Sequence, residues 1–481
     1  MFNVCEMIDE NRKYYIYGTT AMGRYCYNMI TKRYGENLVL GFVQTMPQRE
    51  ICMGKRVYNV QQAIEQTKNS TDSIVFILAS LKRADEMKNN LLEHGISEDS
   101  MFSMEQYGFI IQYIPEKQVK NILLWPPIET RNTDLSVKIK WFVPDKINIG
   151  ICSSNHEVMS DFADAENIEF VDSEEIEEKL ETSDYIAVWD TETADLRIET
   201  YRHKVHVIDP NFYHVTELTN YRFLYYSGFS EEEKEEFRKH SLEVFKKMKK
   251  EYSGVERANV FCTGPSIEEI EGNSYRGDFN VICNSMVKDK EFLENIKPSM
   301  LTFGDLAFYL SPNDYCKAFY KDLLETYEKY NYYIAVYDYE VPLIKKYFPM
   351  LYDRLIGVKQ SGAYNFPNDS EVRVRGTANI CTLFMIPFAS AVCDKIGIAG
   401  CTGRDPEEKY FWKHNGRCQY LDLMHCVFEA YPSFFKYENY EDYYNVHCQC
   451  MQDLIEYGEQ NGKKYINLTT SFIPVLQERR E

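Results

Sequence analysis

Short apolar runs that alternate with helical patterns constrain the fold of this chain most strongly. Residues 14–17, 38–43 and 74–78 are rich in Val, Ile, Leu and aromatic side chains, as buried strands are. Helical patterns follow the first and the last of these runs. Because parallel strands are joined by long crossovers, usually helices, the alternation predicts an α/β fold with parallel sheets.

The length and the linkers divide the chain into three Rossmann-like blocks. A length of 481 residues suggests about three domains. We predict a small α/β domain over residues 1–120 and a second α/β block over 121–252, which ends in a charged linker helix at 230–252. The third block, a parallel-sheet domain over residues 253–481, carries the functional motifs described below.

The first two blocks carry weak functional signals. Gly18 and Gly23 follow a predicted strand but do not form a Gly-x-Gly-x-x-Gly fingerprint, which favours a structural or regulatory domain over an NAD site. In the second block, His203, His206 and His214 lie near Asp209 in the sequence. They do not form a helical His-x-x-x-His pair, so a structural role is favoured over a metal site.

Composition narrows the class of protein. A net charge of −20 argues against broad nucleic-acid binding, which requires a basic surface. The sequence shows neither a secretory signal nor an apolar run of the ~20 residues that span a membrane, so we expect a cytoplasmic protein. The 14 cysteines are scattered without paired Cys-x-x-Cys units, which indicates reduced thiols and predicts no metal site.

The third block opens with a strand, a tight turn and a helix start at residues 260–270. Backbone N–H groups at such a turn lack helical partners and lie at the positive end of the helix dipole. Gly264 permits close approach of a ligand, and Pro265 suits a first helical position. The turn at Gly264, Pro265 and Ser266 is therefore a candidate phosphate site, with an ordinary βα turn as the alternative.

Polar residues recur at the predicted strand ends of this block. Thr263, Asn284, Asp305 and Thr402 each follow an apolar run. Ligands of open α/β sheets bind at the carboxyl ends of the strands, so the recurrence favours a phosphate or nucleotide site at this edge.

Together these motifs resemble the bacterial CMP-sialic acid-dependent sialyltransferases. The similar pieces are Thr263-Gly-Pro-Ser, Cys283-Asn284, Phe303-Gly-Asp305, Arg373-Val-Arg-Gly-Thr377, Ile398-Ala-Gly400, Tyr410 and Tyr444-Asn-Val-His447. A related Gly-Pro-Ser signature occurs in motility-associated transferases of nonulosonic acids. The resemblance covers residues 257–475 and implies a sialyltransferase-like parallel-sheet domain.

The resemblance also implies site residues. The donor site would comprise Thr263, Gly264, Pro265, Ser266, Asn284, Asp305, Gly376, Thr377, Thr402 and Tyr410. His447 would be the general base, with His425 and His414 as rivals. Asp305 stands where the family has asparagine, and Gly376-Thr377 where it has Ser-Gly, so these two donor contacts are departures from the family pattern.

The predicted function is therefore metal-independent, inverting transfer of a sugar, such as a sialic or other nonulosonic acid, from a CMP-activated donor to a glycan or surface polysaccharide. No cofactor is expected, since the CMP-sugar is a substrate. A metal-dependent nucleotide- or pterin-phosphate transferase and a non-catalytic glycan-binding scaffold remain alternatives. Association with the inner face of the membrane and oligomerisation stay open.

Overall fold

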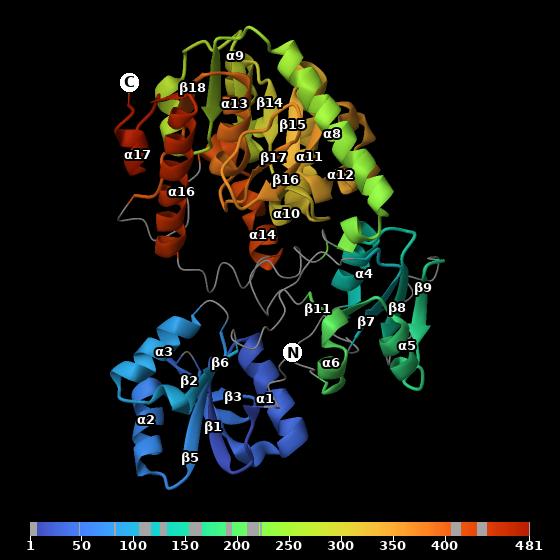
Figure 1. Ribbon diagram of the computed structural model, residues 1–481, viewed down its shortest axis with the longest axis vertical. Helices are drawn as coiled ribbons and strands as arrows, with labels where there is room; N and C mark the ends of the chain where they lie inside the picture. The colour runs from blue at the N-terminus through green and yellow to red at the C-terminus, as the bar shows by residue number, and fades with distance from the viewer. Residues whose placement is uncertain are drawn as a thin grey trace. The chain divides into compact units, whose positions relative to one another are not determined.

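The computed structural model describes residues 7–47, 49–80, 83–104, 117–125, 132–152, 166–188, 195–208, 221, 224–405, 415–430 and 440–480. These residues form three mainly parallel sheets with helices packed on them, so the predicted α/β class is confirmed (Figure 1). In the described part of the chain, none of the helices has both the length and the apolar character needed to cross a bilayer.

The first sheet has the strand order β3-β4-β2-β1-β5-β6 and is parallel except for the β3–β4 hairpin. Alternating side chains of β1 bury Tyr14 and Ile16 on the face that contacts α1, and Tyr15 and Tyr17 on the opposite face. The strands are β1 (Arg12–Tyr17), β2 (Val39–Gln44), β3 (Ile51–Cys52), β4 (Lys55–Asn59), β5 (Ser73–Leu78) and β6 (Met101–Ser103). The helices are α1 (Ala21–Tyr34), α2 (Val60–Asn69) and α3 (Ala84–Glu93).

The second sheet is parallel throughout, in the order β11-β10-β7-β8-β9. Its strands are β7 (Asn121–Leu124), β8 (Asn148–Cys152), β9 (Ile168–Val171), β10 (Tyr185–Val188) and β11 (Val205–Val207). Its helices are α4 (Asn132–Phe142), α5 (Ile176–Thr182) and α6 (Arg197–Thr200). His206 on β11 stacks on Tyr185 with ring centroids 3.9 Å apart, whereas His203 is exposed. Asp209 and His214 lie outside the described residues.

The third sheet has eight parallel strands in the order β17-β16-β15-β14-β13-β12-β18-β19. They are β12 (Arg257–Phe261), β13 (Phe279–Cys283), β14 (Met300–Thr302), β15 (Tyr333–Tyr337), β16 (Leu355–Ser361), β17 (Arg373–Arg375), β18 (Lys395–Ala399) and β19 (Lys464–Asn467). Strands β16 and β17 are absent from the sequence-based prediction. Only the first half of β16 is buried, and β17 is three residues long with flanking arginines, so neither shows a clear apolar run.

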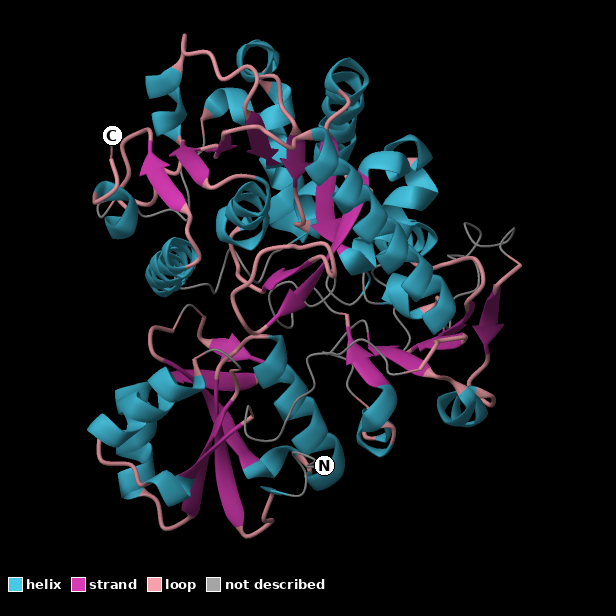
Figure 2. Cartoon of the chain, turned by 45° about the horizontal axis from the view of Figure 1, so that its top comes forward, coloured by secondary structure: helices cyan, strands magenta, loops and turns pink. Residues whose placement is uncertain are grey.

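Helices cover both faces of this third sheet (Figure 2). One face packs against α8 (Glu231–Glu251), α13 (Ile386–Val392) and α16 (Tyr440–Gln460). On the other face Phe261 contacts Phe292 of α9 (Lys290–Ile296), and Phe303 contacts Phe319 of α11 (Asp314–Tyr330). Shorter helices are α10 (Leu306–Tyr309), α12 (Val341–Tyr347), α14 (Met424–Ala430) and α17 (Pro474–Gln477).

Helix α8 belongs to the third sheet rather than to the second block. Val244, Phe245 and Met248 are buried in the core of the third sheet, and Ser241 Oγ accepts a hydrogen bond of 2.9 Å from the Gly357 N–H. The chain accordingly divides into compact units near Gly228, the first two sheets in one and the third in the other. This corrects the predicted boundary at 252/253, because the apolar stripe of α8 is buried against β16 (Figure 1).

Candidate functional site

The strand order of the third sheet reverses between β12 and β18. These strands are parallel neighbours, with Val260 opposite Ile398 and Phe261 opposite Ala399. From β12 the chain builds the sheet toward β17, and it then returns to add β18 and β19 on the other side. Ligands of open α/β sheets bind at such a switch point, outside the carboxyl ends of the strands.

Two glycines let the loops after β12 and β18 touch. The Gly264 N–H donates to Gly400 O at 2.9 Å, and a Cβ on Gly264 would lie 2.5 Å from that oxygen. Gly400 has φ +69°, and a Cβ there would lie 2.2 Å from Cys262 O. Neither contact is compatible with a larger residue, so both glycines are required by close backbone approach.

The backbone N–H groups of the turn after β12 have hydrogen-bond partners within the protein. Residues Pro265–Ile270 form a 3₁₀ helix of six residues instead of an α-helix. The Ser266 N–H donates to Thr402 Oγ1 at 3.0 Å, and the Ile267 N–H donates to Gly264 O at 3.1 Å. The Gly264 and Ser266 N–H groups thus lack intrahelical partners, as expected, but the loop after β18 already accepts hydrogen bonds from both, and Pro265 has no N–H.

A hydroxyl network links the segments that follow β12, β18 and β19. Ser266 Oγ lies 2.8 Å from Thr402 Oγ1 and donates to Thr469 Oγ1 at 3.1 Å. Thr469 Oγ1 also accepts from the Gly400 N–H at 2.9 Å and is fully buried. Sequence reasoning missed Thr469, although it follows the strand β19 just as Thr263 follows β12.

Three predicted donor residues end adjacent strands. Register pairs Phe261 with Ile282, so Thr263 and Asn284 lie at equivalent positions beyond β12 and β13. Asn284 is half-buried and adopts φ +53°, a left-handed conformation in which asparagine is enriched among non-glycine residues. Asp305 follows β14 and is exposed. The predicted gathering of these residues at one edge is thus observed.

Asp305 borders a buried group of tyrosines. Burial, the neighbouring Tyr315 and the Asp305 carboxylate raise the pKa of Tyr309 well above its ordinary value. Tyr315 donates to Gln419 Oε1, and Ser285 Oγ donates to Cys418 O at 2.5 Å. Residues 415–420 therefore pack on the segment after β13 and on α11.

The three candidate histidines lie in different parts of the third block. His447 lies on α16, is 4% exposed, and forms a hydrogen bond with the Cys401 thiol after β18. The fold therefore brings it to the switch point. His425 lies exposed on α14, with Nδ1 3.2 Å from Asp422 O. His414 and the predicted phosphate ligand Tyr410 lie outside the described residues.

Gly376 and Thr377 follow the edge strand β17. Gly376 N–H donates to Ser361 O at 3.0 Å, and Thr377 Oγ1 lies 2.9 Å from Thr382 Oγ1. Tyr443 of α16 donates to Ala378 O at 2.6 Å. These contacts join the segment to β16, to the π-helix that follows it and to α16, whereas β17 itself is the outermost strand of the sheet.

A π-helix, Cys381–Met385, then leads the chain into α13 and on to β18, the neighbour of β12. The sulfur atoms of Cys262, Cys381 and Cys401 all lie within 4.8 Å of one another, and Met385 Sδ is 4.0 Å from Cys262 Sγ. Hydrogen bonding with Cys262 raises the pKa of Cys401 to about 11, and Cys262 and burial also raise the pKa of Cys381. Sequence reasoning missed this cluster because its cysteines are distant in the chain and follow no ligand-spacing pattern.

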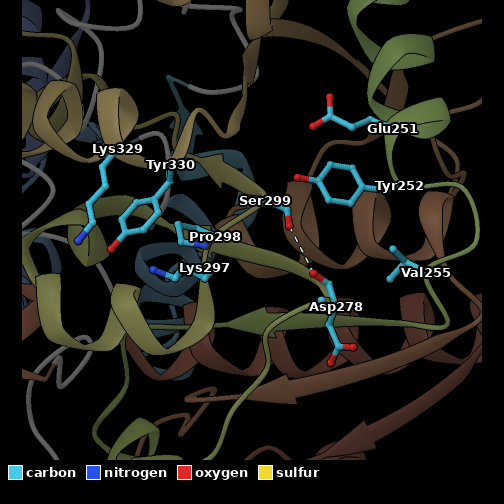
Figure 3. Close-up of a pocket in the computed structure, with 10 residues that line it drawn as sticks. Glu251, Tyr252, Val255, Asp278, Lys297, Pro298, Ser299, Lys329 and Tyr330 are labelled. Atoms are coloured by element: carbon cyan, nitrogen blue, oxygen red, sulfur yellow. Dashed lines mark hydrogen bonds between the residues drawn. The ribbon is translucent and has the colours of Figure 1, made fainter.

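A separate pocket of about 540 Å³ lies at the opposite edge of the sheet (Figure 3). Tyr252, Asp278, Lys297 and Tyr330 are among its lining residues, and no predicted site residue is. The Glu294 carboxylate accepts hydrogen bonds from Lys297, Lys329 and Tyr330, which lower the pKa of Glu294 to about 2. The Glu294 carboxylate and the lining residues Glu251 and Asp278 together offset the two lysine charges, so the pocket is a poor anion site.

Comparison with known proteins adds no assignment. Neither a protein-family model, a curated protein nor a solved structure matches the chain.

Proposed function

We propose that the carboxyl edge of the third sheet binds a CMP-activated sugar, such as a sialic or other nonulosonic acid, and transfers the sugar to a hydroxyl group of a glycan. The observation that carries the proposal is the convergence at one switch point of the Gly264 turn, Asn284 and His447. These residues lie in the order that the sialyltransferase-like motifs imply, and they come from distant parts of the third block.

Asn284 would bind the nucleoside part of the donor. Its left-handed backbone costs roughly 1 kcal/mol or more for a non-glycine residue, and such conformations cluster at ligand sites. No hydrogen bond to its side-chain amide occurs among the described residues, whereas an amide both donates and accepts. These properties suit recognition of a base or ribose edge.

The phosphate would bind at the Gly264 turn in exchange for an internal hydrogen bond. The Ser266 N–H donates to Thr402 Oγ1 at 3.0 Å. Rotation of the Thr402 side chain would release that N–H for a phosphate oxygen, and the Ser266 and Thr402 hydroxyls would supply further donors. The leaving phosphate would thus gain neutral hydrogen-bond donors in place of a metal ion.

The transfer step needs a base, for which His447 is the candidate. The acceptor O–H proton passes to the imidazole while the acceptor oxygen bonds to the anomeric carbon. The bond from that carbon to the phosphate oxygen breaks, its electron pair leaves with CMP, and the configuration inverts. Histidine suits this role because its ordinary pKa lies near neutral pH.

Binding specificity tests the proposal first. Titration calorimetry with CMP, CDP, UDP, GDP and NAD should show CMP binding at least about tenfold more tightly than the others, a difference of roughly 1.4 kcal/mol. Selective binding of UDP or NAD without a response to CMP would contradict the assignment.

Release of CMP from CMP-sialic acid in the presence of glycan acceptors tests the base. We expect His447→Ala to lower the rate about 100-fold or more with CMP affinity nearly unchanged. His425→Ala is the matched control because His425 is exposed on α14. Full activity in His447→Ala would refute the role of His447, and loss in His425→Ala alone would transfer the role to His425.

A further inference from the structure

We propose that Cys262, Cys381 and Cys401 bind a zinc ion at the switch point of the third sheet. Their sulfur atoms lie within 4.8 Å of one another, and they form the one such group of His, Cys, Asp or Glu ligand atoms found in the described part of the chain. In a tetrahedral zinc site with Zn–S bonds of about 2.3 Å, sulfur ligands lie roughly 3.8 Å apart. The cluster therefore needs only small side-chain adjustments to hold the ion.

Each thiol is held by a firmly packed part of the fold. Cys262 directly follows β12, and Cys401 follows β18 after Gly400. Cys381 begins the π-helix, where its N–H donates to Asn379 Oδ1 at 2.9 Å. Three segments that are distant in the chain thus present a cysteine to the same point. Such convergence is what a metal site requires, since ligands on rigid elements are already in place.

The surroundings of the cluster suit a soft ion. Cys381 is 2% exposed, and Cys262 and Cys401 are 8% exposed. Met385 Sδ, 4.0 Å from Cys262 Sγ, adds a polarizable atom at the margin of the cluster. Thiolate and thioether sulfur favour zinc and other thiophilic ions over magnesium or calcium, which prefer oxygen ligands.

His447 supports the cluster without being one of its three ligands. Its imidazole forms a hydrogen bond with the Cys401 thiol, but it is not among the ligand atoms that lie within 4.8 Å of all the others. Partners that hydrogen-bond to metal ligands orient them and tune the ion. Three protein ligands leave the fourth position of a tetrahedral zinc ion for a water molecule.

Binding would release the three thiol protons to solvent and form three Zn–S bonds, with no change in oxidation state. The ion would join the loop that carries Gly264 to the loop that carries Thr402. This inference stands apart from the proposed sugar transfer, which needs no metal. Zinc binding and CMP binding can therefore fail independently.

Metal analysis of the full chain, purified without chelator after growth with zinc, tests the inference. We expect about one zinc per chain, and in the demetallated protein a rise in melting temperature of roughly 5 °C at free zinc about 100 times Kd. Cobalt(II) should give the intense sulfur-to-metal charge-transfer absorption of thiolate ligation. A chain without zinc, with no thermal response and no such absorption, would overturn the proposal.

Single variants assign the ligands. Cys262→Ser, Cys381→Ser and Cys401→Ser should each lower zinc affinity at least about 100-fold. Cys393→Ser, which changes a buried cysteine of the same unit outside the cluster, should retain the zinc. Because a cluster variant could fail to fold, titration of the wild-type chain with a mercurial thiol reagent provides a second measurement, in which reaction of the cluster thiols should release about one zinc per chain to a chromophoric chelator.

His447→Ala separates this site from the proposed catalytic base. We expect the variant to retain zinc with affinity reduced by roughly 10- to 100-fold, as for other partners of metal ligands. A complete loss, equal to that of the cysteine variants, would make the imidazole a ligand and would overturn the assignment of three thiolates and an open position.

Discussion

The first and third sheets each have a switch point, and a glycine-containing turn stands at both. In the first sheet, Gly18 follows β1, and the strand order reverses between β1 and β5. In the third sheet, Gly264 lies in the turn that follows β12, after Cys262 and Thr263. In both turns, backbone of the neighbouring loop occupies the space that a Cβ would need. A Cβ on Gly18 would lie 2.9 Å from Ala79 O, and a Cβ on Gly264 would lie 2.5 Å from Gly400 O.

The two turns differ in what surrounds them. The first leads into α1, a true α-helix of 14 residues, but it faces Ala79 and Ser80 across the switch point. The second leads into a 3₁₀ helix of six residues, and its Ser266 hydroxyl forms hydrogen bonds with Thr402 and Thr469. The Cys401–His447 pair follows β18 at the same switch point. Topology thus creates a place for a ligand, and the side chains decide whether chemistry can occur there.

Alanine at a glycine of each turn should give the largest effects and should separate the two units. A Cβ at Gly23 would lie 2.1 Å from Gly18 O, and one at Gly264 would lie 2.5 Å from Gly400 O. Because backbone cannot move aside cheaply, we expect each change to cost about 3 kcal/mol of unfolding free energy. Hydrogen exchange measured by mass spectrometry should locate the loss in the unit that carries the change.

The same pair tests the functional contrast between the turns. We expect Gly264→Ala to abolish CMP binding, and Gly23→Ala to leave the CMP Kd within about twofold of wild type at a temperature where both variants are folded. Loss of CMP binding in Gly23→Ala alone would place the nucleotide site in the first sheet and contradict its assignment to the third.

Two asparagines with left-handed backbone provide a sharper test within the third sheet. Asn284 at φ +53° lies at the carboxyl edge, and Asn331 at φ +51° ends α11 before β15. We expect Asn284→Ala to weaken CMP binding about tenfold, or roughly 1.4 kcal/mol, because it removes an amide at the ligand. Asn331→Ala imposes the same backbone strain away from the site and should leave CMP affinity unchanged.

Asp305→Asn extends this test, because it restores the asparagine of the sialyltransferase-like pattern and removes a negative charge beside the donor. We expect CMP to bind about threefold more tightly. Weaker CMP binding in Asp305→Asn would show that the carboxylate itself contacts the donor or a metal ion, in favour of the metal-dependent alternative.

The edge of the third sheet that carries the candidate site could be predicted from the sequence, because apolar runs mark where strands end. The apolar runs before Thr263, Asn284 and Asp305 predict three strands that end at one edge, and the structure has them. The filled donors of the Gly264 turn were not predictable, since the Thr402 hydroxyl that accepts from Ser266 N–H comes from 136 residues away. The thiol cluster was hidden for the same reason: it depends on β18 pairing with β12, which local periodicity does not specify.

The smallest expected effect is a difference in acid sensitivity between the units. Burial of His206 in the second sheet, stacked on Tyr185, lowers its pKa to about 4. The unfolded chain binds a proton near pH 6.5 while the folded chain does not, so stability is complete above pH 6.5 and falls as the pH drops toward 4. With a discount for partial exposure of the residue, the loss between pH 7.5 and 5 should be about 1 kcal/mol.

His206→Phe keeps an aromatic ring against Tyr185 but cannot titrate, so the difference between this variant and the wild type isolates the histidine from other acids. Denaturant unfolding, followed by hydrogen exchange in each unit at both pH values, should show that difference in the first unit and not in the third sheet. An equal acid-induced loss in His206→Phe would assign the sensitivity to carboxylates instead, and the neutral stacked imidazole would then contribute nothing to the pH dependence.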